Sequence, residues 1–240
     1  VVLESRLSNP IIPLRIFRVR TLTMSSVVRG FVVVGMYSTF FLGALYFEHV
    51  RHFGTLDTGL AFLPMSVVVA IFSSGLTARL VGRFGAKRVL IPGLTAMLAG
   101  LLVLTQMGPG TGYFPAGFIA FTVMGIGGGT AFTPLLTIAM SEVPAVDAGL
   151  GSGIINVSMQ GSAALGVAIL GTVAADRTKA LAATHSHVVA LTDGYQLAFL
   201  IASACVLVGI VLAAFVLPAP AVERSSEVPA PDADAEFVHV

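Results

Sequence analysis

Charge is scarce in this chain. Only 10% of its 240 residues are Asp, Glu, Lys or Arg, against roughly 25% in soluble globular domains. A chain this poor in charge has too few polar groups to cover a surface that faces water, so the composition excludes an ordinary soluble domain. The formal net charge is only +1 and no basic stripe runs along the sequence, so nothing points to nucleic acid as a partner.

Cysteine and tryptophan are nearly absent as well. The single cysteine, Cys205, excludes an internal disulfide, and its apolar surroundings predict a small buried side chain. The sequence shows no cluster of residues with metal-ligand spacing and no combination of nucleophile, base and orienting group. It therefore implies no metal, no cofactor and no enzymatic activity.

Long apolar runs make up most of the sequence. The mean hydropathy is +0.94, and a helix of about 20 apolar residues crosses the roughly 30 Å hydrocarbon core of a bilayer. The runs are continuously apolar, whereas membrane strands alternate in polarity. We therefore predict an all-α membrane protein with six transmembrane helices, at about residues 22–47, 59–81, 89–107, 113–140, 148–175 and 195–217.

The polar segments between the spans predict the orientation. Residues 1–21 form a cytoplasmic lead-in, residues 22–217 the bundle, and residues 218–240, rich in Pro, Ala and acid, a disordered cytoplasmic tail. With the N-terminus inside, the inner segments hold Arg6, Arg15, Arg18, Arg20, Arg79, Arg83, Lys87, Arg88 and Arg224, and the outer loops hold only Arg51, Arg177 and Lys179. This bias places both termini in the cytoplasm. The chain begins with Val1, which suggests that residues are missing upstream.

A few polar residues within the spans are candidate functional residues. Arg29 lies about two turns inside the first span, so it either lines a central cavity or extends its side chain to the headgroups. Asn156 and Gln160 share one helix face, and either line that cavity or bond to another helix. Tyr37 is a weaker candidate for the same cavity.

Two further patterns suggest parts that move. Gly125 and Gly129 form a small-xxx-small pair that lets helices approach closely, and Pro134 is expected to kink the same span. Packing alone is the alternative interpretation. Arg83, Lys87 and Arg88 lie in a tight basic loop, which either acts as a conformational gate or only anchors the topology.

Several stretches in this order resemble a known family. They are the lead-in PLRIFR at 13–18, GLAFLP at 59–64, RFGAKR at 83–88, GIGGGTAFTP at 125–134 and DAGLGSGIIN at 147–156. Together they resemble the major facilitator superfamily, and more narrowly the C-terminal half of the fourteen-helix drug:proton antiporters of the EmrB/QacA type.

The resemblance implies a fold and a function. The fold would be one half of a major facilitator, built from two inverted three-helix repeats. The function would be proton-coupled efflux of small amphipathic molecules across the plasma membrane, together with a missing N-terminal bundle. No Asp or Glu lies clearly inside a span, so the proton-carrying acid is expected in that other half. A half-transporter that pairs with a second copy of itself, and a membrane assembly partner that transports nothing, remain alternatives.

Overall fold

The computed structural model describes residue 16 and residues 19–217. The predicted tail at 218–240 and most of the predicted lead-in lie outside the described residues. Within them, six helices are long and apolar enough to cross a membrane, which confirms the predicted all-α bundle. In chain order the elements are α1 (Arg20–His49), α2 (Thr55–Ala61), α3 (Leu63–Ile71), η3 (Phe72–Leu76), α4 (Thr77–Phe84), α5 (Ala86–Leu104), η4 (Tyr113–Gly117), α6 (Phe118–Met140), η5 (Ala145–Asp147), α7 (Ala148–Leu181) and α8 (His187–Phe215).

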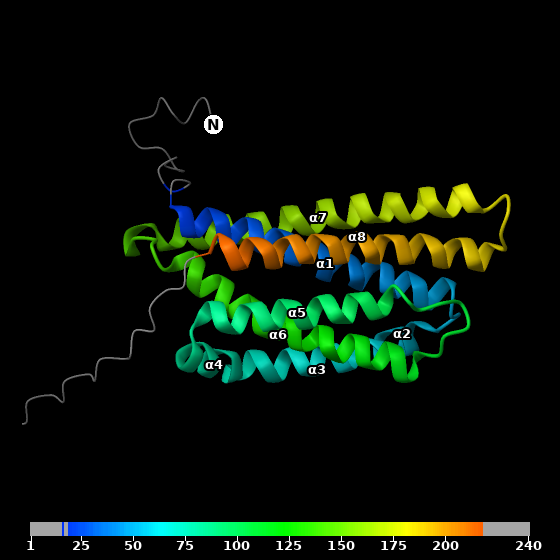
Figure 1. The fold of residues 1–240 in the computed structure, drawn as a ribbon, viewed down its shortest axis with the longest axis horizontal. Helices are drawn as coiled ribbons and strands as arrows, with labels where there is room; N and C mark the ends of the chain where they lie inside the picture. The colour runs from blue at the N-terminus through cyan, green and yellow to red at the C-terminus, as the bar shows by residue number, and fades with distance from the viewer. Residues whose placement is uncertain (1–15, 17–18, 218–240) are drawn as a thin grey trace, which may run out of the picture.

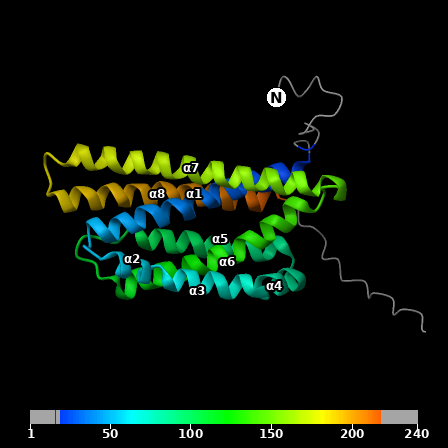
Figure 2. The same cartoon turned by 180° about the vertical axis from the view of Figure 1, so that it is seen from behind.

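The helices pack in two layers (Figures 1 and 2). One layer is a row of four spans in the order α7, α1, α6 and α3, and the other consists of α8 and α5. Helix α8 packs on α7 and α1, while α5 packs on α6 and α8. Helices α1 and α6 therefore lie at the centre of the bundle, and α3 and α7 form the two edges of the four-helix layer.

The contacts repeat with an internal symmetry. Spans one, two and three (α1, α3 and α5) correspond to spans four, five and six (α6, α7 and α8). Under this correspondence the α1–α7 contact is equivalent to the α6–α3 contact, and the α1–α8 contact to the α6–α5 contact. The α1–α6 and α5–α8 pairs map onto themselves. Because each repeat has an odd number of spans, the second repeat starts at the opposite face of the membrane. This is the predicted pair of inverted repeats.

Several helix ends differ from the predicted span ends. Helix α7 continues to Leu181 and α8 begins at His187, so the connection predicted at residues 176–194 is only a short turn. The basic loop is also shorter than predicted. Arg83 is the penultimate residue of α4, Lys87 and Arg88 lie in the first turn of α5, and Gly85 alone separates the two helices. The prediction of a loop was wrong because Gly85, at φ 87°, reverses the chain in one residue.

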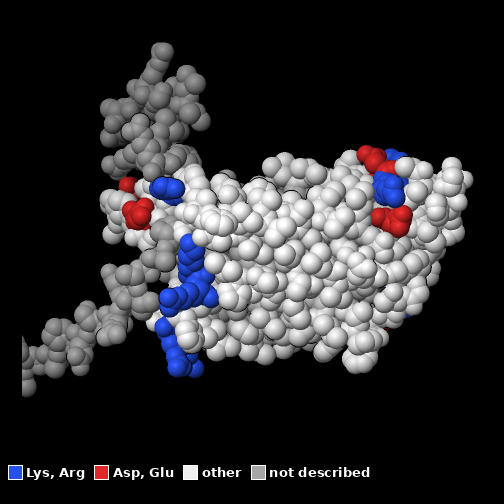
Figure 3. Space-filling view, in the orientation of Figure 1, with Lys and Arg blue, Asp and Glu red and all other residues white. Residues whose placement is uncertain are grey.

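Lys and Arg side chains gather at one end of the molecule (Figure 3). We call this the basic end, and define it by the ends of α1, α4 and α5 that carry Arg20, Arg79, Arg83, Lys87 and Arg88. The opposite end carries ion pairs between Arg177 and Asp193, at 3.5 Å, and between Lys179 and Asp176.

Aromatic side chains fill the core toward the other end. Phe47 of α1 is 1% exposed and packs against Phe62 and Phe121, whose ring centroids lie 6.1 and 5.8 Å away. Phe62 and Phe121 contact each other at 4.8 Å. This cluster joins the first, second and fourth spans, so their ends away from the basic end form one packed unit.

Candidate functional site

Arg29 projects from α1 toward two neighbouring helices. Its Nη2 lies 3.6 Å from Sδ of Met159 on α7, and its guanidinium carbon lies 5.1 Å from the ring centroid of Phe132 on α6. At 1.5 Å per residue, Arg29 lies about 14 Å from the start of α1. The structure thus places a cation where α1, α6 and α7 meet, well inside the span.

The environment of Arg29 leaves its charge incompletely compensated. Its Nε atom is buried and has no hydrogen-bond partner within the described part of the chain, and none of the ion pairs found there involves Arg29. Contact with the Phe132 ring stabilises the cation by about 0.5–2 kcal/mol, which is less than the cost of removing an unpaired charge from water. An anionic group at this point would satisfy the free donor.

The predicted amides lie close to Arg29. Asn156 and Gln160 are both exposed, and Met159, the contact of Arg29, directly precedes Gln160. Measured along α7, the two amides lie about 12 and 18 Å from its start, at the depth of Arg29. Tyr37 is 38% exposed but lies two turns further along α1. Met159 therefore places Arg29 against the segment of α7 that carries the amide pair, and Tyr37 is near enough to interact electrostatically with the Arg29 cation.

Sequence reasoning missed both direct contacts of Arg29. Phe132 and Met159 are an aromatic and a thioether residue within apolar runs, and nothing in their local sequence distinguishes them from core residues. The only available signal was spacing: Met159 lies between the two amides along α7.

The glycines of α6 give it close neighbours on two sides. A Cβ on Gly125 would lie 2.8 Å from the Met65 carbonyl oxygen of α3, and a Cβ on Gly129 would lie 2.6 Å from Cβ of Phe72. Gly127 faces α5 instead, and a Cβ on Gly128 would be in ordinary contact with side chains of α1 and α3. The close approach predicted for Gly125 and Gly129 is present, and the second span is their neighbour.

The second span is broken where it meets this glycine surface. The backbone leaves helical geometry at Ser74 and at Gly75, which has a φ of 108°. Two residues later, the Thr77 hydroxyl donates a hydrogen bond of 3.0 Å to the Gly129 carbonyl oxygen of α6. The short helix α4, which carries Arg79 and Arg83, therefore follows a break that is held by one interhelical hydrogen bond.

Pro134 does not break its span. Helix α6 remains helical through Pro134 up to Met140, so the irregular backbone lies in the second span rather than at the proline. Neighbouring helices can supply the contacts that a proline removes from a membrane helix.

Lys87 makes a long-range contact. Its Nζ donates a hydrogen bond of 2.8 Å to the Leu217 carbonyl oxygen after α8.

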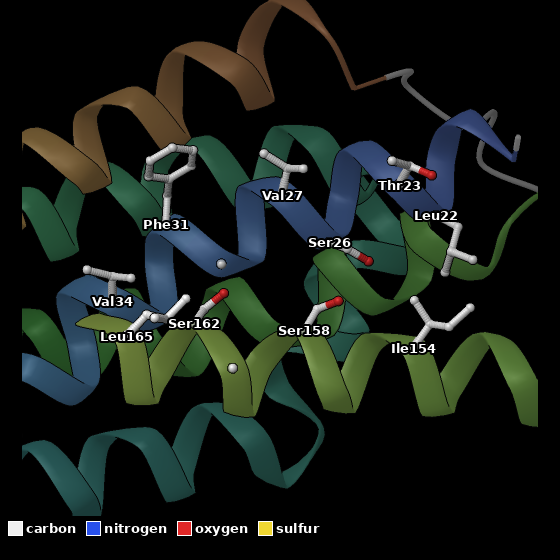
Figure 4. Close-up of a pocket in the computed structure, with 12 residues that line it drawn as sticks. Leu22, Thr23, Ser26, Val27, Phe31, Val34, Ile154, Ser158, Ser162 and Leu165 are labelled. Carbon is white, nitrogen blue, oxygen red and sulfur yellow. The ribbon is translucent and has the colours of Figure 1, made fainter. Parts of the chain in front are cut away.

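A hollow of about 550 Å³ lies between α1 and α7 (Figure 4). Its polar lining consists of hydroxyls from Thr23 and Ser26 on α1 and from Ser158 and Ser162 on α7. Aliphatic and aromatic side chains form the rest. Ser158 is two residues from both Asn156 and Gln160, which places it about 160° around the helix from each of them. The hollow and the amides are thus on opposite sides of α7.

Within the described residues, no group of three or more His, Cys, Asp and Glu side chains is arranged to hold a metal ion. The site therefore consists of one partly buried cation, two amides and apolar walls. Such a set can bind and orient a molecule, and it offers no nucleophile for chemistry.

Comparison with known proteins agrees with this architecture. The sequence model of the Major Facilitator Superfamily matches residues 3–167 and, in an overlapping match, residues 71–240. The puromycin resistance protein pur8 of Streptomyces alboniger is 30% identical over 217 residues, covering 88% of this chain and 43% of that protein.

Two further relatives are similar over most of the chain. The multidrug resistance protein Stp of Mycobacterium tuberculosis is 34% identical over 173 residues, 72% of this chain and 32% of Stp. The cephamycin export protein CmcT of Amycolatopsis lactamdurans is 27% identical over 179 residues, 74% of this chain and 37% of CmcT. The chain spans less than half the length of the curated relatives it matches. Its six apolar helices and its match to the superfamily over nearly its whole length show that it is a multi-pass membrane protein that belongs to the major facilitator superfamily.

Proposed function

We propose that this chain forms the C-terminal half of an efflux transporter that exports small amphipathic molecules in exchange for protons. The relatives named for drug resistance and export support the efflux direction. The observation that carries the proposal is the position of Arg29, a partly buried cation at mid-depth that contacts the segment of α7 carrying two exposed amides. An intramembrane ionisable residue of this kind marks a substrate or ion pathway.

A second helical bundle would complete the binding site. In the most apolar part of each span, only 17% of the second-span residues and 22% of the fifth-span residues are buried, against 56% and 61% in the first and fourth spans. On α3, Leu63, Val67 and Ile71 are about half exposed. We propose that the four-helix layer faces the other bundle, and that substrate binds between the two halves near Arg29, Asn156 and Gln160. Tyr37 would contact a larger substrate further along.

The broken second span would serve the change between access states. Alternating access in this superfamily is largely a rocking of one bundle against the other. In this proposal α4 pivots at Gly75 while Thr77 stays hydrogen-bonded to Gly129. The gate would comprise Arg83, Lys87 and Arg88 at the basic end, with Gly125, Gly129 and Pro134 as the surface on which the second span moves.

The proton carrier would belong to the other bundle. The Asp and Glu residues in the described part of the chain all lie in loops or within about two turns of a helix end. Protons are therefore a proposed coupling partner of the complete transporter. The basic end would face the cytoplasm of a cell whose plasma membrane holds the protein.

Two alternatives keep the same fold. A free-standing chain would pair with a second copy, as symmetric oligomers do. A chain that only assembles with other membrane proteins would use its glycine faces and move nothing. Substrate binding by the purified chain would contradict this second alternative.

The size of the native polypeptide separates these proposals. An immunoblot with an antibody against residues 218–240 should show a band near twice the 24.8 kDa of this chain. A band at 24.8 kDa would contradict the proposal of a half within a longer polypeptide and would favour the self-paired alternative.

Coupling needs its own test. The complete protein, reconstituted into vesicles, should export substrate faster when a proton gradient is imposed. Export that does not depend on the gradient would rule out proton exchange while leaving the efflux proposal intact.

A further inference from the structure

The hollow between α1 and α7 is separate from the proposed substrate face, because its lining lies on the opposite side of α7 from the amides. Deeper along α1, Phe31 lines the hollow and lies near α8, where a Cβ on Gly209 would be 3.5 Å from Phe31 Cβ. The hollow therefore opens away from the face that we assign to the second bundle. At this depth a bilayer surrounds the protein.

The length of the hollow matches one leaflet of the membrane. Its lining on α1 runs from Leu22 to Val34, which is about 18 Å along the helix. Half of the hydrocarbon core is about 15 Å. The hollow starts within the first turn at the basic end, so its long axis follows the path of an acyl chain in the leaflet at that end.

Arg20 lies on the face of α1 that lines the hollow, at the end of the hollow nearest the basic end. Arg20, Thr23, Val27 and Phe31 recur at spacings of three and four residues, so they share one face of α1. Arg20 is exposed at the start of the helix, at the level of the headgroups. The nearby carboxylate of Glu142 accepts a hydrogen bond of 3.2 Å from Thr21, which points about 100° away from Arg20.

The mouth also has an unused polar atom. Ser26 lines the hollow, and its Oγ is buried beside it without a hydrogen-bond partner among the described residues. A buried hydroxyl without a partner is costly in an apolar environment. Figure 4 shows Ser26 on α1 and Ser158 on α7 beside the same space.

We propose that this hollow binds an anionic phospholipid from the leaflet at the basic end. One acyl chain lies in the hollow, the phosphate pairs with Arg20, and the buried Ser26 hydroxyl turns toward the hollow to donate a hydrogen bond to an ester carbonyl. The inference rests on the proposed function only for the identity of that leaflet as the cytoplasmic one.

The chain's lack of tryptophan permits a direct test. Leu165 lines the hollow and is 64% exposed, so Leu165→Trp places a single fluorophore there. Any tryptophan beyond this chain is replaced by Phe. The protein is reconstituted into vesicles containing brominated phosphatidylglycerol or brominated phosphatidylcholine, which quench a tryptophan that they touch. We expect about a fivefold preference for phosphatidylglycerol, the effect of one basic residue near an anionic headgroup.

Matched variants locate the effect. Ala164→Trp places the fluorophore at the same depth but outside the hollow, and it should report no preference. Gly161→Leu fills the hollow, while Gly153→Leu adds the same side chain elsewhere on α7; a Cβ meets nothing within 4 Å at either position. Gly161→Leu should abolish the preference seen by Leu165→Trp, and Gly153→Leu should keep it.

Arg20→Gln tests the charge. We expect it to reduce the preference to about one, with quenching by phosphatidylcholine unchanged. Equal quenching by both lipids in the parent Leu165→Trp protein would overturn the proposal, as would an unchanged preference in Gly161→Leu or Arg20→Gln. No substrate or proton gradient enters this measurement, so a failure of the efflux proposal would not alter its result.

Discussion

The second and fifth spans occupy equivalent places in the two repeats, yet their backbones differ. Each forms one edge of the four-helix layer, and they are the two least buried spans. The second is divided into α2, α3, η3 and α4, whereas the fifth contains the single 34-residue helix α7. One edge of the layer is an interrupted helix and the other is a continuous one. The symmetry of the helix contacts therefore does not extend to the backbone geometry of the two edge spans.

Glycine alone does not explain this difference. Helix α7 contains Gly149, Gly153, Gly161 and Gly171, each of which has open space around a hypothetical Cβ and none of which interrupts the helix. Gly75 breaks the second span because its φ is positive and because Thr77 is hydrogen-bonded to another helix two residues later. The break therefore coincides with a hydrogen bond to α6, a feature that the open glycines of α7 lack.

The largest expected effect concerns the continuous edge. If α7 and α1 form the wall of a binding site, Arg29→Leu should reduce export by the complete protein about tenfold to a hundredfold, because a hydrogen bond to a charged group contributes about 1.5–3 kcal/mol. Export of a fluorescent substrate from cells measures this. Arg79→Leu, which removes an exposed charge near the basic end, is the control and should retain most activity. Normal export by Arg29→Leu would favour the interpretation that this side chain only extends to the headgroups.

The next effect concerns the packing of α6 against the interrupted second span. Gly129→Leu forces a side chain against Phe72 and Val69 and should lower the free energy of unfolding by about 1–3 kcal/mol. Gly153→Leu on α7 adds the same side chain in open space and should change it by less than about 0.5 kcal/mol. Denaturant unfolding in detergent micelles compares them. Equal stability of the two variants would mean that α3 can move away from α6 at little cost.

Alanine substitutions should have opposite signs at the two edges. Gly75→Ala places a Cβ on a residue with φ of 108° and should destabilise the protein by about 1–2 kcal/mol. Gly171→Ala adds a methyl group within a regular helix and should stabilise it by about 0.5–1 kcal/mol. The same unfolding measurement decides the signs. Stabilisation by Gly75→Ala would show that the second span is a regular helix in the membrane.

The smallest effect concerns the hydrogen bond beside the break at Gly75. Thr77→Val keeps the shape of the side chain but removes the donor to the Gly129 carbonyl oxygen, and should cost about 1 kcal/mol. Thr172→Val removes a hydroxyl whose hydrogen bond, to Ala168 of its own helix, is exposed, and should cost only a few tenths of a kcal/mol. If the two variants had the same free energy of unfolding, the Thr77 hydrogen bond would not stabilise the structure beside the break at Gly75.

The spans could be predicted because burial in a bilayer is a property of composition. A run of about 20 apolar residues crosses the membrane whatever its neighbours are, and all six predicted spans are present. Their ends were less predictable, because helices continue into the headgroup region. Asp193, for example, was placed in a loop and lies in the second turn of α8.

The details of the site depend on contacts that the sequence does not encode locally. Arg29 was identifiable as a charge in an apolar run, but its neighbours Phe132 and Met159 are more than 100 residues away along the chain. The positive φ of Gly75 lies two residues before the Thr77 hydrogen bond to α6, a contact that could not be identified from the local sequence. Pro134 is the opposite case, because its residue type predicts an interruption that the backbone does not have. Proline usually ends a helix in a soluble protein, but Pro134 lies within the continuous helix α6.

The glycines of α6 also limit how this bundle can move. Gly125 and Gly129 fit closely against the second span and Gly127 against the third, so two neighbours approach this helix at different angles. Turning α6 about its own axis would move Ile126, the one residue with a side chain between these glycines, toward a neighbouring helix. Close contacts on two sides of α6 therefore oppose a turn of this helix about its own axis.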